Sequence, residues 1–243
     1  MKHIPRFYVE TELTAEADVA LSKTQIHHAT NVLRMKVGDR VQVFNELFGE
    51  WTCIISNIKK CTLRCEEMIS GPHKSDRNVE IAFSIIQPNR MSVLLEKVTE
   101  LGVTKIFLLK TQYSQHKNVN IEKLLQTLIG ACEQCGRIDI PKIFPPENLQ
   151  DFLKRHNEKT TLLVADEKQN EASKKLSYFS CSNPDIKRIL IVGPEGGFSD
   201  NERELFDQHR YVERISLGRT TLRSETAAII CVASQTVFAK DSL

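Results

Sequence analysis

Short stretches in which apolar and polar residues alternate dominate the first 72 residues, and they predict half-buried β-strands. These stretches are residues 40–44, 50–58 and 61–69. Between residues 22 and 35, the apolar positions follow helical spacing and predict one helix. A polar, turn-forming linker follows at residues 71–76. This pattern is typical of a small β-barrel domain that covers residues 1–72.

A different pattern begins after the linker, where nearly continuous apolar strands alternate with helices. The predicted strands are residues 79–86, 103–109, 162–165, 189–192 and 212–215. The predicted helices are residues 91–101, 121–136, 200–209 and 225–239, with Ser199 and Glu202 as a capping box for the third and Ser224 as the cap of the last. Such strands are typical of a sheet covered on both faces. Residues 73–243 are therefore predicted to form an α/β domain with a mostly parallel sheet.

Composition and charge narrow the classes of protein to consider. The 243 residues are 41% hydrophobic and 26% charged, which is typical of a folded chain. No apolar run reaches the roughly 18–20 residues of a membrane span, and the first residues lack the apolar core of a signal peptide. The net charge of +2 excludes binding of nucleic acid through bulk basicity. A nucleic-acid site would have to be local, and the positive excess of +3 lies in residues 73–138.

Seven cysteines, an odd number without a signal peptide, favour a reducing cytoplasm. Cys132 and Cys135 form the one suggestive pair, and Cys61 with Cys65 lies in a predicted strand. A zinc site would need a second cysteine or histidine pair at ligand spacing, which neither pair has. We therefore expect no metal, and small buried hydrophobic roles for most of these side chains.

Three of the ten glycines lie within residues 193–197, between a buried strand and a capped helix. Ligands of parallel α/β sheets bind beyond the carboxyl ends of the strands, and glycines there let a ligand approach the main chain. No Gly-Lys-Ser/Thr and no dinucleotide fingerprint is present. The segment is either a ligand-binding loop or simply a tight turn.

Residues 217–227 repeat this arrangement of strand, polar loop and helix. Arg223 and Glu225 flank the start of an apolar helix, which we expect to be buried in the domain or in a subunit interface. The two side chains either take part in chemistry or form an ion pair that closes the turn.

Two further segments carry basic residues on predicted helices. Arg90 and Lys97 are seven residues apart and share a helical face, which by itself would be a solvated face. Arg137 follows Glu133 and Gln134 at a helix end, where it would complement the helix dipole.

In combination, these segments resemble the RsmE family of SPOUT methyltransferases, which methylate N3 of a uridine in 16S ribosomal RNA. Residues 5–8 and 31–39 are similar to the amino-terminal PUA-like barrel of that family. The similarity to its catalytic-domain signatures lies in residues 96–103, 131–137, 193–198 and 222–227. The chain departs from the usual family pattern at residues 87–91 and 217–220.

The resemblance implies a PUA-like β-barrel followed by a SPOUT α/β domain with a trefoil knot, an exception to the rule that chains do not thread loops. It also implies a homodimer with S-adenosylmethionine (SAM) at the knot and the strand end at Ala165 and Asp166 beside it. The implied cofactor-binding residues are Ala165, Gly193, Pro194, Glu195, Gly196, Gly197, Leu217, Gly218, Leu222 and Thr226.

For the reaction, the resemblance leads us to expect Arg223 to stabilise the negative charge that develops on the uracil ring. Glu225 would orient Arg223 or act as the base. The partner would be 16S ribosomal RNA of the small subunit, in the cytoplasm. The residues expected to bind RNA are Arg6, Arg34, Arg90, Lys97, Glu133, Gln134 and Arg137.

Two other functions fit the same residues. One is another knotted methyltransferase, such as an enzyme acting on a tRNA ribose 2′-oxygen. The other is a non-catalytic ribosome-assembly protein that binds RNA and retains the fold.

Overall fold

The structure is a computed structural model that describes residues 4–58, 60, 62–73, 78–114, 119–156, 158–166, 168, 174–175 and 187–237. The chain divides into two compact units. Unit 1 comprises residues 1–75 and 132–140, and unit 2 comprises residues 76–131 and 141–243. Cys61 and the last residues of the predicted helix 225–239 lie outside the described part.

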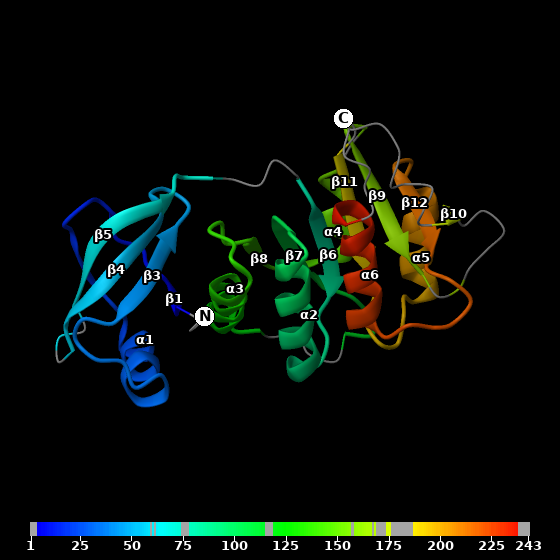
Figure 1. The fold of residues 1–243 in the computed structure, drawn as a ribbon. Helices are drawn as coiled ribbons and strands as arrows, with labels where there is room; N and C mark the ends of the chain where they lie inside the picture. The colour runs from blue at the N-terminus through cyan, green and yellow to red at the C-terminus, as the bar shows by residue number, and fades with distance from the viewer. Residues whose placement is uncertain are drawn as a thin grey trace. The chain divides into compact units, whose positions relative to one another are not determined.

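Unit 1 is built on a five-stranded sheet with the strand order β1-β3-β4-β5-β2 (Figure 1). Its strands are β1 (Arg6–Tyr8), β2 (Asp18–Ala20), β3 (Arg40–Asn45), β4 (Gly49–Asn57) and β5 (Thr62–Ser70). The pairing of β1 with β3 is parallel and the others are antiparallel. The strands expected near residues 40–44, 50–58 and 61–69 are confirmed. Val41, Cys53 and Leu63 supply part of the core, as alternation predicts.

The helix expected over residues 22–35 is only partly correct. Ser22 caps a short α-helix, α1 (Lys23–His27), which continues as a π-helix, η1 (His28–Val32). The wider π turn shifts later side chains off the 3.6-residue period, so Val32 is 61% exposed. Arg34 then takes a left-handed conformation with φ +53°, which ends the helical segment.

Arg6 on β1 fixes the end of helix α3 (Ile121–Cys135) within unit 1. Its guanidinium donates to the carbonyls of Cys132, Glu133 and Arg137 at 2.7, 3.2 and 3.3 Å. It also pairs with Glu50 at 2.7 Å, and its side chain is only 9% exposed. A cation at a helix carboxyl end is stabilised by the helix dipole and by the unpaired carbonyls of the last turn. Arg6 is therefore a buried link between the first strand and the end of α3.

Unit 2 contains a seven-stranded sheet with the order β10-β12-β9-β11-β6-β7-β8 (Figure 1). The strands are β6 (Glu80–Ser84), β7 (Lys105–Lys110), β8 (Lys142–Asn148), β9 (Thr160–Ala165), β10 (Lys174–Lys175), β11 (Lys187–Val192) and β12 (Val212–Ser216). Every described pairing is parallel. The carboxyl ends of all seven strands therefore lie along one edge of the sheet, and the loops that follow neighbouring strands become neighbours there.

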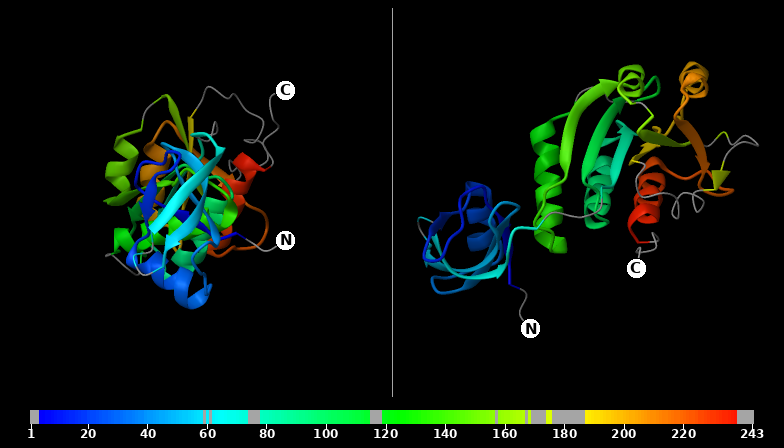
Figure 2. Two further views of the ribbon diagram at one scale, coloured as in Figure 1. Left: turned by 60° about the vertical axis from the view of Figure 1, so that its left-hand side comes forward. Right: turned by 90° about the horizontal axis from the view of Figure 1, so that it is seen from above.

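Helices cover both faces of this sheet, as the apolar strands predict (Figure 2). One face carries α2 (Pro88–Glu100) and α6 (Ser224–Thr236), and the other carries α4 (Leu149–Lys154) and α5 (Asp200–Gln208). Phe152 of α4 and Phe206 of α5 pack on one core cluster with Leu162 and Ile189 of the sheet. The predicted mostly parallel α/β organisation is confirmed.

Two predicted helix starts have different outcomes. Ser199 and Glu202 form the expected capping box of α5. Ser224 is not a cap, because Arg223 holds the extended N-cap conformation and its carbonyl accepts from the Ala227 amide at 2.8 Å. Helix α6 therefore begins one residue earlier than the cap pattern predicts, and Ser224 is its first buried residue.

Candidate active site at the carboxyl edge of the parallel sheet

A pocket lies beyond the carboxyl ends of the adjacent strands β12, β9 and β11. Its empty volume, with the open solvent at its mouth included, is about 560 Å³. It is lined by Ala165, Asp166, Val192, Gly193, Pro194, Leu217, Gly218, Arg219, Thr220, Thr221, Leu222, Ser224 and Ala227. The two loops singled out in the sequence thus face each other across one pocket, with the end of β9 between them.

Glycine is required at two points of these loops. A Cβ on Gly193 would lie 3.0 Å from the ring of Phe198, which is itself buried. Gly218 has φ +124°, a conformation that other residues rarely adopt. Packing against Phe198 therefore requires glycine at position 193 and the backbone conformation favours it at position 218, and both residues line the pocket.

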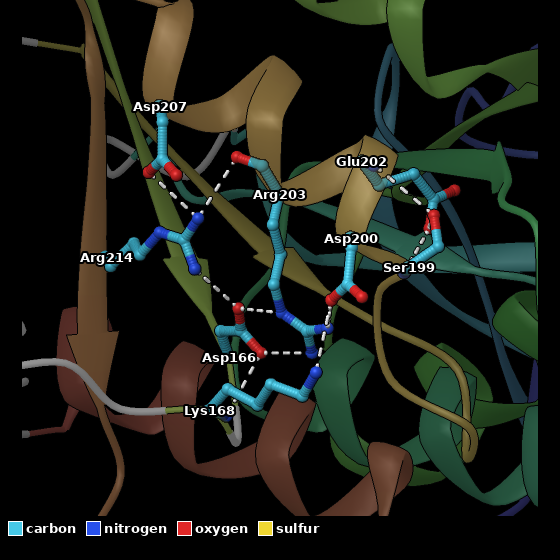
Figure 3. Close-up of polar contacts among 8 residues, drawn as sticks. All are labelled: Asp166, Lys168, Ser199, Asp200, Glu202, Arg203, Asp207 and Arg214. Atoms are coloured by element: carbon cyan, nitrogen blue, oxygen red, sulfur yellow. Dashed lines mark hydrogen bonds and ion pairs between the residues drawn. The ribbon is translucent and has the colours of Figure 1, made fainter.

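Asp166 is the centre of a buried ion-pair network at the end of β9 (Figure 3). Its carboxylate accepts two hydrogen bonds from Arg203 of α5, at 2.9 and 3.0 Å, and one from Arg214 of β12, at 2.8 Å. The Asp166 side chain is 1% exposed. Arg203 and Arg214 also pair with the exposed Asp200 and Asp207. The network fixes the floor of the pocket to a helix and to a neighbouring strand.

The structure brings together only part of the predicted cofactor set. Those that line the pocket are Ala165, Gly193, Pro194, Leu217, Gly218 and Leu222. Those that do not are Glu195, Gly196, Gly197 and Thr226. Sequence reasoning missed Ser224 and Ala227, which are three residues apart and share the buried face of α6; helical periodicity is the signal that finds them.

Beside the pocket, Arg90 lies between two carboxylates. Its guanidinium is 3.5 Å from Glu195 and 4.0 Å from Glu225. The second carboxylate oxygen, Oε2, of both glutamates is buried and has no hydrogen-bond partner among the described residues. Arg90 is thus partly buried in an ion-pair cluster, whereas its spacing with Lys97 predicts a solvated position. Glu225 pairs with Arg90, and no ion pair between Arg223 and Glu225 is found in the described part of the chain.

The residues predicted to bind RNA fall into different environments. Arg6 and Arg137 are largely buried, and Arg137 pairs with Asp139 at 2.7 Å. Glu133 accepts from the Tyr8 amide at 3.0 Å and so helps to hold β1. The others are at least partly exposed: Arg34, Arg90, Lys97 and Gln134.

Cys132, the first residue of the cysteine pair, is buried in unit 1. Cys132 is fully buried against Phe44 and Ile138, and burial raises the pKa of its thiol to about 12. The thiol is therefore protonated at neutral pH, unlike a metal-binding or redox-active cysteine. Within the described residues, no group of three or more His, Cys, Asp or Glu side chains is placed to hold a metal. Nor does this part of the chain contain a helix long and apolar enough to cross a membrane.

Comparison with known families defines the class of protein. Residues 73–235 match the RNA methyltransferase domain family, and residues 21–67 match the RNA methyltransferase PUA domain family. A parallel sheet with a glycine-lined pocket at its carboxyl edge agrees with this class, the RNA methyltransferases.

Three relatives narrow the family. The chain is 37% identical to the ribosomal RNA small subunit methyltransferase E of Rickettsia conorii, over 94% of this chain and 93% of that one. A Legionella pneumophila protein solved with bound SAM is 31% identical with a TM-score of 0.82, over 97% and 98% of the two chains. Ribosomal RNA small subunit methyltransferase E of Neisseria gonorrhoeae, solved with bound S-adenosyl methionine, is 25% identical with a TM-score of 0.80, over the same shares. The chain belongs to the ribosomal RNA small subunit methyltransferase E family.

Proposed function

We propose that this protein transfers the methyl group of SAM to N3 of a specific uridine in 16S ribosomal RNA of the small subunit. The observation that carries the proposal is the pocket beyond β12, β9 and β11, whose loops are the segments that resemble the SAM-binding signatures of the family. The substrate places the enzyme in the cytoplasm.

The two parts of the chain take different tasks. Residues 1–72 form a PUA-like β-barrel that binds RNA, and residues 73–243 form the SPOUT methyltransferase domain with a trefoil knot. Supporting this division are the PUA match over residues 21–67 and the insertion of β11 between β6 and β9. That strand order makes neighbours of loops that are far apart in the sequence.

The residues of the pocket fit SAM. Gly193 and Gly218 leave main-chain groups accessible, as the adenine and the amino-acid portion of SAM require. Ala165, Pro194, Leu217 and Leu222 supply apolar surface for the adenine ring. When bound, SAM supplies a sulfonium methyl group for attack by N3. Gly196 and Gly197 follow the lining residues in the 193–197 loop, and Thr226 lies in the first turn of α6 between the lining residues Ser224 and Ala227.

Catalysis then requires that the N3 proton leave and that the resulting negative charge be stabilised. Arg223 stands exposed at the N-cap of α6, next to Ser224 of the pocket, and donates to a carbonyl oxygen of uracil. Glu225, which pairs with Arg90 beside the pocket, takes the N3 proton on its carboxylate. Because N3 lies on the pairing edge of the base, the uridine must be unpaired or flipped out.

RNA binding by unit 1 rests on Arg34, which is exposed and held in a left-handed conformation. A strained conformation at a non-glycine residue is common at functional sites. We expect Arg34→Ala to weaken binding to unmethylated small subunits. The slope of the logarithm of the binding constant against the logarithm of the salt concentration should become smaller in magnitude by about one. Arg40→Ala, which removes an exposed arginine that already pairs with Glu66, is the control. Equal losses in both variants would contradict a specific role for Arg34.

The protein acts as a homodimer. Helices α2 and α6 lie side by side on one face of the sheet (Figure 1). They leave Val93 and Ile230 exposed, at 46 and 37%, and Val237 at the carboxyl cap of α6 is 62% exposed. Burying such side chains is favourable, by about 25 cal/mol per Å² of apolar surface. Sedimentation should give a mass of two chains, and Ile230→Asp should shift the protein toward the monomer. A monomeric parent protein would contradict the proposal.

Mass spectrometry of 16S ribosomal RNA from cells that lack this protein tests the function. We expect the loss of one N3-methyluridine and its return when the parent gene is restored. Loss of a ribose methyl group in tRNA would point to the other enzymatic function. If no modification changes and calorimetry detects no SAM binding, the protein is instead a non-catalytic RNA-binding protein.

A further inference from the structure

The carboxyl edge of the sheet continues past the pocket to strands β6 and β7. The strand order places β11 next to β6, and β6 next to β7. The loop after β11, residues 193–197, therefore has the pocket on one side and the segments that follow β6 and β7 on the other.

Consecutive residues of this loop contact different parts of unit 2. Gly193 and Pro194 line the pocket. Glu195 pairs with Arg90, in the first turn of α2. Gly196 lies against Tyr113, since a Cβ at Gly196 would be 3.1 Å from the Tyr113 Cβ and 3.5 Å from the first atom of its ring. Arg90 and Tyr113 thus both lie next to the residues of this loop that directly follow the pocket-lining Gly193 and Pro194.

Tyr113 is held on a rigid turn after β7. The amide of Ser114 donates to the Thr111 carbonyl at 3.2 Å, and the two hydroxyl groups are 2.8 Å apart. The amide of Gln112 donates to the buried Glu202 at 2.8 Å. The backbone on both sides of Tyr113 is therefore fixed, yet its side chain is 47% exposed.

We propose that Tyr113 is the stacking platform for the target base, which lies flat on the exposed phenol ring with its pairing edge toward Arg90 and the pocket. This inference rests on the proposed function, because it assumes that RNA presents a flipped uridine to this edge. Single-stranded or flipped bases are held by stacking on aromatic side chains. The guanidinium of Arg90 offers N–H donors, which match the two carbonyl oxygens that flank N3 of uracil.

The arrangement also accounts for the glycine at position 196. A Cβ there would lie 3.1 Å from the Tyr113 Cβ, so any side chain would push against Tyr113 and displace it. A fixed ring beside a fixed loop lowers the entropy that is lost when the base is ordered, and so aligns N3 for transfer.

The test compares Tyr113→Ala with Tyr113→Phe in the full-length protein. Alanine keeps the Cβ that contacts Gly196 and removes only the ring, whereas phenylalanine keeps the ring and removes only the hydroxyl. The probe is unmethylated small ribosomal subunits, with KM for the subunits, kcat and the SAM dissociation constant measured separately. Tyr211→Ala is the matched control, because Tyr211 is a half-buried aromatic at the amino end of β12, the opposite edge of the sheet.

We expect Tyr113→Ala to raise KM for the subunits by about 5- to 150-fold, the range for loss of one stacked base. SAM affinity should stay within about twofold, and Tyr113→Phe and Tyr211→Ala should behave like the parent protein. Unchanged kinetics in Tyr113→Ala would overturn the proposal, as would a parallel loss of SAM affinity, which would make Tyr113 a support for the 193–197 loop. An inactive parent protein would instead refute the proposed function, so the two failures are distinct.

Discussion

Replacing Arg223 with alanine is expected to lower the rate of methyl transfer by at least roughly 100-fold, the usual effect of removing one donor to a developing negative charge. SAM affinity should stay within a few-fold, because Arg223 is not among the residues that line the pocket. Single-turnover transfer of labelled methyl groups to unmethylated small subunits, with calorimetry of SAM binding, measures both quantities.

Two further variants test whether the donor geometry of Arg223 matters in addition to its positive charge. Arg223→Lys keeps the positive charge but loses the planar donor geometry, so it should restore only part of the rate. Arg210→Ala removes an exposed arginine just before the amino end of β12 and should leave the rate unchanged. Retained turnover in Arg223→Ala would refute the assignment and leave Arg90, which lies between Glu195 and Glu225, as the stabilising cation.

Replacing Asp166 with alanine is expected to lower the free energy of unfolding of unit 2 by about 3–5 kcal/mol. The reason is the removal of one buried carboxylate that serves two guanidinium groups, those of Arg203 and Arg214, which are only 10 and 11% exposed. Their other acidic partners, Asp200 and Asp207, are in solvent and compensate little. Urea unfolding followed by circular dichroism measures the loss.

The control for this prediction lies in the same network. Asp200 pairs with Arg203 at 3.4 Å but is 83% exposed, so Asp200→Ala should cost less than about 1 kcal/mol. SAM affinity should fall in Asp166→Ala and not in Asp200→Ala, because Asp166 also lines the pocket. If both variants unfold at the same urea concentration as the parent protein, the network does not stabilise the pocket floor.

Local patterns were sufficient for most of the elements of unit 2. Strands β6, β7, β9 and β11 are largely apolar and the longer helices carry apolar residues at helical spacing, so the pattern located them. It did not locate β8, β10 or α4, which are short or rich in polar residues and proline. The capping box of Ser199 and Glu202 placed the start of α5 correctly, since two reciprocal hydrogen bonds form within four residues. The Ser224 cap was wrong, because a lone serine carries no such reciprocal signal and burial against the pocket decided its position.

Arg6 illustrates a role that local patterns do not reveal. Its neighbours, residues 5–8, resemble the amino-terminal PUA-like barrel of the family, and its role in RNA binding stays a prediction. In the folded chain its partners are the carbonyls of Cys132, Glu133 and Arg137, more than 120 positions away. No periodicity or spacing links residues at that separation.

The sequence by itself determined the class of fold, the two glycine-bearing loops and the family, because these depend on residue types within a short stretch of chain. Only the tertiary structure decided which loops meet. The order β12-β9-β11-β6-β7 joins the ends of β12, β9 and β11 in one pocket and brings Arg90 and Tyr113 next to the loop that follows β11. Strand order depends on which apolar surfaces pack together after collapse, and many orders satisfy the same sequence of apolar strands. For that reason the site, unlike its component segments, became visible only in the folded chain.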